Sequence, residues 1–162
     1  MNLGSFEIFG LQVALSFIAY GIVAKWYVFP RVAALPLRDG LLPLVLAHTL
    51  RHVGLVVLVP VVTDPNLPRN WTVPLAYGDL AAQLLAVLAA FALRGGWSFA
   101  IPLVWIFNIV GTVDFLVAYV HGSILEVYKF NLNSVWYITT FIGPALLVVH
   151  FMIFALLIKR PK

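Results

Sequence analysis

The chain contains five long stretches that are almost free of charged side chains, and these stretches restrict its fold more than any other feature. A helix that crosses a bilayer needs about 20 mainly apolar residues, because it rises about 1.5 Å per residue. The sequence therefore predicts an all-α, polytopic membrane bundle that forms a single domain over residues 1–162. It has five transmembrane helices, or four if the first stretch lies in the membrane interface. The predicted spans are residues 6–29, 41–62, 74–94, 98–121 and 135–158.

The composition agrees with lipid as the solvent for much of the chain. Hydrophobic residues make up 63% and charged residues 10% of the 162 residues, whereas a soluble domain carries about 25% charged residues. Cysteine is absent, which excludes disulfides, thiolate metal sites and cysteine nucleophiles. The net charge is +4, but the basic residues form no stripe, so nucleic acid is not an expected partner. The expected partners are the lipid bilayer, a second copy of the chain or a larger membrane complex.

Lysine and arginine at the span ends predict the orientation, because cytoplasmic loops carry an excess of these residues. The first and third loops and the C-terminus hold seven basic residues, and the opposite side holds two. We therefore expect the N-terminus outside and the C-terminus in the cytoplasm. The seven are Lys25, Arg31, Arg38, Arg94, Lys159, Arg160 and Lys162, and the two are Arg69 and Lys129.

Ionisable residues inside the spans are the candidate functional residues. A charged side chain in the middle of a span costs about 2.5–3.5 kcal/mol on insertion scales, so such residues normally face the bundle interior. In "HTLRH", His48, Arg51 and His52 are three and four residues apart, which places them on one face of an α-helix. The candidates for binding a ligand or cofactor are His48, Arg51, His52, Asp79, Asp114 and His150, and the secondary candidates are Gln83, Asn108 and His121.

The topology divides these residues by depth. His48, His52 and His150 belong to the inner half of the membrane, and Asp79, Asp114 and His121 to the outer half. Arg51 lies near the boundary and is expected to pair with one of the two aspartates. Helix side chains lean toward the N-terminus of their helix. Arg51 and Asp79 then lean apart on antiparallel spans, so we expect water between them.

Three roles are open for the inner histidines. They could be neutral imidazoles that hydrogen-bond between helices. One histidine of the second span could instead join His150 as axial ligands of a b-type haem, with Arg51 on a propionate. A less favoured alternative is a metal site of His48, His52 and His150, which the charge of Arg51 opposes. "HTLRH" lacks the glutamate of the H-E-x-x-H pattern, so it does not indicate a zinc protease.

Four segments carry a resemblance to a family of small bacterial membrane proteins with no known activity. They are "HTLRHVGLVVLVPVV", "DPNLP", "VPLAYGDL" and "WIFNIVGTVDF". The resemblance covers residues 45–120 and implies a multi-pass protein of the bacterial inner membrane. It transfers no catalytic residue to this chain.

The polar residues of the spans suggest a function inside the bundle, since no soluble domain is present to carry one. The leading hypothesis is a membrane protein that binds a small ligand or cofactor in a buried polar site between helices. The alternatives are a haem- or quinone-linked redox protein, a small transporter or channel for a proton, ion or small solute, and an accessory subunit of a membrane complex. The sequence leaves open whether the protein is an enzyme.

Overall fold

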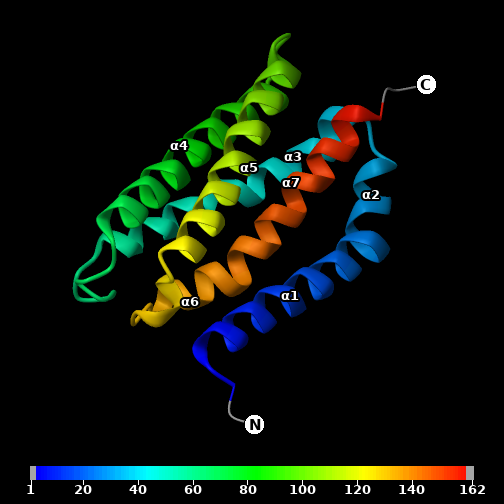
Figure 1. Cartoon of the computed structure of the whole chain (residues 1–162). Coiled ribbons are helices and arrows are strands. Elements are labelled where there is room, and N and C mark those ends of the chain that lie inside the picture. Colours follow the sequence, from blue (N-terminus) through cyan, green and yellow to red (C-terminus); the bar gives the residue numbers. More distant parts are fainter. Residues whose placement is uncertain (1–2, 160–162) are drawn as a thin grey trace.

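The computed structural model describes residues 3–159, which form five long helical rods. Successive rods run in opposite directions along the bundle (Figure 1). The predicted all-α class is confirmed, because residues 3–159 contain no strand. Each rod is long and apolar enough to cross a membrane. Arg160 and Lys162, which contributed to the predicted orientation, lie outside the described residues. The five rods are Ser5–Ala33, Leu37–Leu58, Arg69–Arg94, Ala100–Ile124 and Ser134–Ile158.

Three of the rods combine different helix types. The first rod consists of α1 (Ser5–Val23), the π-helical η1 (Ala24–Val28) and α2 (Phe29–Ala33). The second consists of α3 (Leu37–Ala47) and the 3-10 helix η2 (His48–Leu58). The third and fourth are α4 (Arg69–Arg94) and α5 (Ala100–Ile124). The fifth consists of α6 (Ser134–Tyr137), the π-helical η4 (Ile138–Ile142) and α7 (Gly143–Ile158), and it follows the short 3-10 helix η3 (Val127–Lys129).

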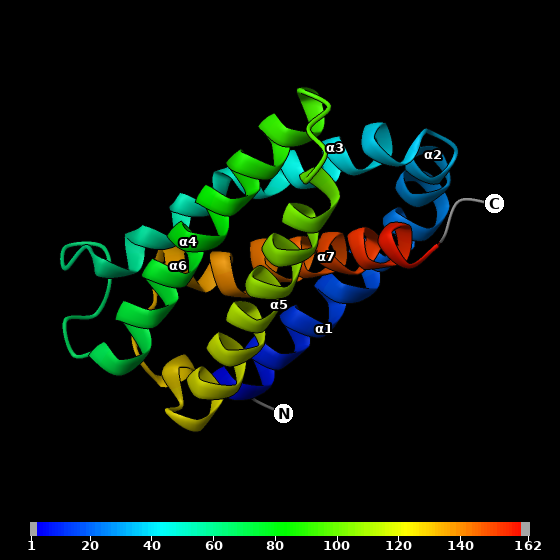
Figure 2. The same ribbon diagram turned by 90° about the horizontal axis from the view of Figure 1, so that it is seen from above.

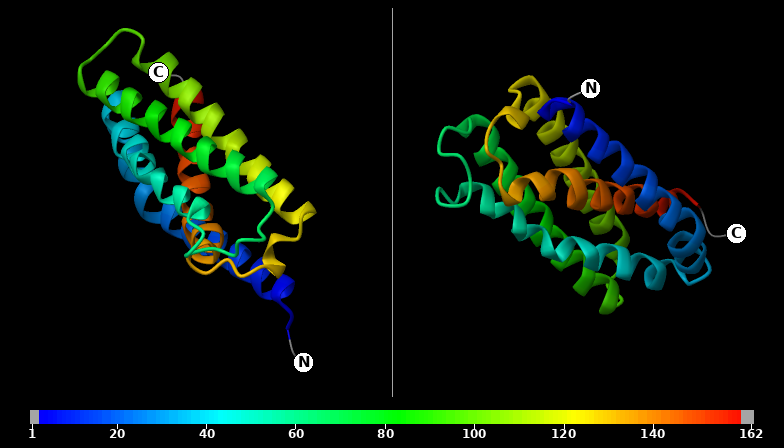
Figure 3. Two further views of the ribbon diagram at one scale, coloured as in Figure 1. Left: turned by 90° about the vertical axis from the view of Figure 1, so that its left-hand side faces the viewer. Right: turned by 90° about the horizontal axis from the view of Figure 1, so that it is seen from below.

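Four rods form a closed bundle, and the first rod lies outside it. The second rod packs on α4 and α7, and α5 packs on the same two helices. The first rod packs mainly against the fifth, as Figures 2 and 3 show. Its buried residues are Ser16, Ala24 and Val32, and Gln12 accepts a hydrogen bond from Trp136 Nε1 at 2.6 Å. Most of its apolar surface therefore remains exposed.

The two π-helical segments each precede a proline. Pro30 follows η1 and Pro144 follows η4. A proline donates no backbone hydrogen bond, and its ring clashes with the carbonyl four residues earlier. Those carbonyls belong to Trp26 and Thr140, which lie inside the π-helical segments. The wider π turn lets the rod continue past each proline.

The 3-10 geometry of η2 decides which of its residues enter the bundle. Its buried residues are His48, Arg51, Gly54 and Val57, a spacing of three throughout. A 3-10 helix has 3.0 residues per turn, so every third side chain lies on one line. His52 leaves this line and is exposed. The shared face predicted from α-helical geometry is therefore correct for His48 and Arg51 and wrong for His52.

The bundle has two ends, which we name after the chain termini that lie there. The N-terminal end carries the connections 59–68 and 125–133, and the C-terminal end carries the turns 34–36 and 95–99 (Figure 1). One buried apolar cluster near the C-terminal end surrounds Phe107. A second, near the N-terminal end, surrounds Trp71. The ionisable residues of the bundle lie between these two clusters.

Hydrogen bonds join the two connections at the N-terminal end. Asp64 donates its backbone N–H to the Asn131 carbonyl at 3.1 Å, and Asn133 Nδ2 donates to the Val62 carbonyl at 2.8 Å. The backbone N–H of Asn66 donates to Asp64 Oδ1 at 2.9 Å and lowers the pKa of that carboxyl. The two connections therefore form one ordered cap over this end of the bundle.

Candidate functional site

Arg51 lies at the centre of the four-rod bundle and binds both aspartates directly. Its Nε and Nη2 atoms are 2.8 and 2.7 Å from Asp79 Oδ1, and Nη2 also donates to Asp114 Oδ2. The Arg51 side chain is fully buried. These contacts leave no place for the water expected between Arg51 and Asp79. The expected pairing with an aspartate is direct, and it involves both aspartates instead of one. Arg51 belongs to the 3-10 helix η2, and its side chain reaches Asp79 of α4 and Asp114 of α5. The lean toward the N-terminus that was expected from α-helical geometry does not apply to it.

The opposite edge of the guanidinium meets the fourth and fifth rods. Arg51 Nη1 donates to the Gly111 carbonyl at 3.3 Å and lies 3.4 Å from His150 Nε2. All three nitrogens of the guanidinium therefore lie against acceptors within the bundle, through four hydrogen bonds and the ion pair of Nη2 with Asp79. The Phe115 ring lies 4.1 Å from Arg51 Cζ and adds a cation–π contact. Arg51 therefore keeps no donor for an anionic ligand.

The hydrogen bonds of His150 determine its tautomer. Asn108 Nδ2 donates to the His150 carbonyl at 3.2 Å, so the amide oxygen Oδ1 faces the ring. His150 Nδ1 lies 2.7 Å from this oxygen and must carry the proton. The other nitrogen, Nε2, then presents a lone pair to Arg51. His150 is a neutral imidazole that ties α7 to α5 and to the arginine.

His48 is the second buried imidazole, and it makes no such bonds. Its ring centroid lies 4.0 Å from that of His150 and 5.1 Å from that of Phe107. Neither ring nitrogen has a hydrogen-bond partner among residues 3–159. A buried polar group without a partner costs about 1–3 kcal/mol. His48 is thus held by packing alone, beside a histidine that is held by hydrogen bonds.

This difference predicts opposite effects for the same substitution at the two histidines. His48→Leu removes unpaired polar atoms, so we expect the free energy of unfolding to stay constant or rise by about 1 kcal/mol. His150→Leu leaves Asn108 Oδ1 and one Arg51 donor unpaired, so we expect a loss of about 2–3 kcal/mol. Unfolding of the purified variants in mixed micelles by added dodecyl sulfate measures both. Equal losses in both variants would show that His48 has a bonding partner outside the protein chain.

The proposed haem ligands were His150 and one histidine of the second span, and the pair of His48 and His150 does not fit a haem. Axial imidazoles bind the iron from opposite faces of a macrocycle, whereas the His48 and His150 rings pack against one another. Both nitrogens of His150 already face protein groups, Asn108 and Arg51. A haem between them would have to separate two rods and break these bonds.

The other predicted site residues lie away from this cluster. His52 points to Gln83, whose Oε1 lies 3.1 Å from His52 Nδ1 and accepts the His52 backbone N–H at 2.5 Å. His121 is half-buried near the end of α5 and forms no side-chain hydrogen bond within residues 3–159. The three histidines proposed as metal ligands are not brought together. No group of three histidine, aspartate or glutamate residues in the described part of the chain is arranged to hold a metal ion.

Three glycines make the close approach of the charged groups possible. A Cβ atom on Gly54 of η2 would collide with the Asp79 carboxylate, and one on Gly78 of α4 would collide with the Asp114 carboxylate. A Cβ atom on Gly111 of α5 would lie 2.6 Å from His150 Cε1 and 2.9 Å from Arg51 Nη1. The roles of Gly54 and Gly78 were not predicted. The only signal in the sequence was proximity, because Gly54 is three residues from Arg51 and Gly78 adjoins Asp79.

A crevice leads from the N-terminal end of the bundle to Asp79. Its volume is about 40 Å³, enough for about two or three water molecules. Polar groups in its wall are already paired, since Trp71 Nε1 donates to the Ala118 carbonyl at 3.0 Å and the Tyr119 hydroxyl donates to the Thr139 carbonyl at 2.5 Å. The deepest polar group in the crevice is the Asp79 carboxylate. The wall also includes Phe9, Leu75, Phe115, Val127 and Ile138.

The ion cluster contains one more acid than base. Asp79 and Asp114 both bind Arg51, and the two histidines beside it are held without a carboxylate partner. Asp79 Oδ2 and Asp114 Oδ1 accept no hydrogen bond from residues 3–159. Buried charges need compensation by a partner or a proton. The site is therefore complementary to a cation, a proton or a hydrogen-bond donor.

Comparison with known proteins places the chain in a family without assigning an activity. No curated protein and no solved structure matches this chain. A family model described as "Domain of unknown function (DUF8737)" matches residues 8–158, which include the complete ion cluster. This finding agrees with the resemblance to a family of unknown activity. Because the match spans nearly the whole sequence, the chain belongs to the DUF8737 family.

Proposed function

We propose that the protein is a multi-pass membrane protein that binds a small, largely apolar molecule through a cationic or hydrogen-bond-donating group. One observation carries this proposal: the crevice ends on a carboxylate from a buried cluster of two acids and one base. An apolar wall with a few convergent polar groups is the usual character of a small-molecule site. Asp79 and Asp114 are the proposed ligand-binding residues, and Arg51 holds both in place.

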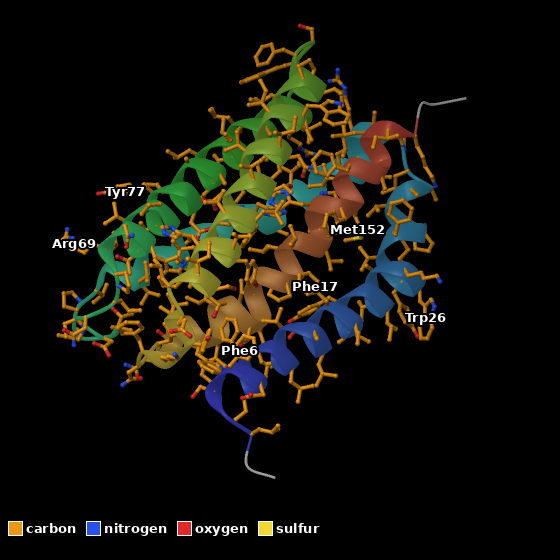
Figure 4. All side chains as sticks on the ribbon, viewed as in Figure 1. Phe6, Phe17, Trp26, Arg69, Tyr77 and Met152 are labelled. Carbon is orange, nitrogen blue, oxygen red and sulfur yellow. The ribbon has the colours of Figure 1, made fainter. Side chains whose placement is uncertain are left out.

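Insertion in a membrane is supported by the surface of the bundle. Large apolar side chains such as Leu15, Ile106 and Phe151 are more than half exposed, whereas the mid-span charges face inward. In Figure 4, Trp26, Arg69 and Tyr77 point away from the bundle, near its ends or its flank. We propose the inner (plasma) membrane as the location, with the N-terminal end outside. The crevice then opens to the outer side.

Binding from one side is favoured over passage through the bundle. Beyond His150, toward the C-terminal end, the bundle centre is filled by fully buried apolar side chains, among them Val45, Val104 and Ile153. A path for an ion through this region would have no polar lining. The Asp79 carboxylate in the crevice also determines which small molecules can bind there. A carboxylate accepts hydrogen bonds from an amine or a hydroxyl group. It repels groups that only accept hydrogen bonds, such as carbonyl oxygens.

The proposal predicts that ethylamine, whose three heavy atoms match a crevice of about 40 Å³, binds the purified protein. Dimethyl ether, which also has three heavy atoms but no hydrogen-bond donor, should bind more weakly. Asp79→Asn and Asp114→Asn should each weaken amine binding about tenfold. The first removes the carboxylate that lines the crevice, and the second removes the other negative charge of the cluster, which is bound to the same arginine. Isothermal titration in detergent micelles measures the affinities. Asp39→Asn is the matched control, since Asp39 is exposed near the opposite end of the bundle and the variant should bind like the native protein.

A further variant tests amine binding without changing any residue of the ion cluster. Ser123 is exposed and lines the crevice, so Ser123→Trp should narrow the entrance without touching Arg51 or its partners. We expect this variant to fold normally and to lose amine binding. Unchanged affinity in Ser123→Trp and in both aspartate variants would refute the proposed site.

One observation also supports a structural role as an accessory subunit. All three guanidinium nitrogens of Arg51 contact acceptors within the bundle, and a satisfied polar network stabilises a particular packing of helices. The first rod leaves a long apolar face exposed, which a partner could cover. This alternative predicts co-purification with a larger membrane complex and the absence of amine binding in the native protein.

A further inference from the structure

A second groove lies on the surface of the bundle, between the second rod and α4. Its walls are Leu42, Leu46 and Thr49 of the second rod and Val87, Ala90, Phe91 and Arg94 of α4. Its volume is about 490 Å³, within the range of small-molecule sites. It shares no lining residue with the crevice that leads to Asp79. The groove is therefore a separate feature of the C-terminal half of the bundle.

The walls of this groove follow the helix axes. Leu42 and Leu46 are four residues apart, and so are Val87 and Phe91, which places each pair on one face of its helix. Leu46 is 47% exposed and Phe91 is 64% exposed. An apolar trough thus runs along the bundle surface in the direction that a lipid acyl chain takes in a bilayer.

Two arginines lie at the end of this trough that meets the C-terminal end of the bundle. Arg94 is the last residue of α4 and lines the groove. Arg38 lies one turn before Leu42, and its Nη1 is 3.5 Å from the Cβ position of Gly96, in the turn after α4. Neither arginine forms an ion pair within residues 3–159, where the ion pairs are those of Arg51 and Lys129. Two unneutralised cations therefore stand where the apolar trough reaches the membrane surface.

We propose that this groove binds one anionic phospholipid, with an acyl chain along the trough and the phosphate at Arg38 and Arg94. Arginine suits phosphate because its planar fork donates two parallel hydrogen bonds. A second copy of the chain fits this face less well. A two-fold axis along the membrane normal would bring the same arginines of both copies together. This inference rests on the proposed insertion in a membrane, but not on the proposed ligand at Asp79.

The test uses the full chain in nanodiscs that contain equal amounts of phosphatidylglycerol and phosphatidylcholine with identical acyl chains. Native mass spectrometry of the released protein counts the lipids that stay bound. We expect retention of one phosphatidylglycerol in preference to phosphatidylcholine. Arg38→Gln and Arg94→Gln should each lower that preference about fivefold, since a basic residue at the surface contributes about 1 kcal/mol toward anionic lipid.

Two control variants separate the headgroup from the chain. Arg69→Gln removes an exposed arginine at the N-terminal end and should leave the preference unchanged. Leu46→Trp fills the trough and should reduce retention of both lipids while the arginines remain.

Equal retention of the two lipids by the native protein would overturn the lipid site, and so would an unchanged preference in both arginine variants. A dimer whose formation Leu46→Trp abolishes would also overturn it, because the groove would then be an interface between copies. Failure of membrane insertion is recognised separately by flotation with vesicles. A chain that floats with no vesicle composition refutes the proposed membrane location, whereas one that floats with all compositions and shows no lipid preference refutes the groove alone.

Discussion

Replacement of Arg51 by methionine is expected to cost more stability than any other single substitution in the bundle. The change leaves two buried carboxylates, Asp79 and Asp114, without their shared cation, and it leaves His150 Nε2 without its donor. Removal of one partner from a buried ion pair costs about 3–5 kcal/mol, a large part of the 5–15 kcal/mol that typically stabilises a domain. The yield of monodisperse protein and the dodecyl sulfate midpoint of unfolding measure the loss.

Two further variants identify the cause of that loss. Arg51→Lys keeps the charge, but its three donors leave from one nitrogen and cannot serve acceptors on three rods. We expect it to recover only part of the stability. The triple variant Arg51→Met, Asp79→Leu, Asp114→Leu removes all three charges and should recover most of it, because apolar side chains often replace buried ion pairs without loss.

The triple variant also separates stability from binding. If the cluster forms the proposed ligand site, this variant should fold and yet bind no ethylamine. An Arg51→Met variant as stable as the native protein would contradict the central place of the arginine, whatever its effect on binding.

The pairing of Arg51 with an aspartate was predictable because its cause is local, whereas its direct contact with both Asp79 and Asp114 was not predicted. A charge within a long apolar segment has to find a partner inside the bundle, and each span contributes few polar residues to choose from. The position of His150 beside Arg51 agrees with the same reasoning. The roles of Asp79 and Asp114 in ligand binding are proposals, which the aspartate variants test.

The displacement of His52 was not predictable from spacing alone. The sequence of residues 48–58 is compatible with an α-helix and with a 3-10 helix, because in both helix types residues at a regular spacing lie on the buried face. The two geometries assign different residues to that face, and tertiary packing selects between them. The shape of the crevice could not be predicted either, because it depends on contacts among four rods and the cap at the N-terminal end.

Gly54→Ala is expected to destabilise the bundle by about 3 kcal/mol, the upper end of the usual range for overpacking. The added methyl group would occupy the space of the Asp79 carboxylate. Asp79 can make room only by moving away from Arg51, which binds it through Nε and Nη2. The substitution should therefore weaken amine binding as well as stability. The dodecyl sulfate midpoint and isothermal titration measure the two effects.

Gly10→Ala provides the matched control, because a Cβ atom at Gly10 meets nothing within 4 Å. Alanine has a higher helix propensity than glycine by about 1 kcal/mol, so we expect this variant to be slightly more stable than the native protein and to bind the amine normally. Both substitutions add the same methyl group to a helix, and only the one at Gly54 reaches a carboxylate. Opposite signs for the two changes would show that close packing of Gly54 on Asp79 holds the ion cluster together. A shift in the same direction and of similar size for both would contradict that role.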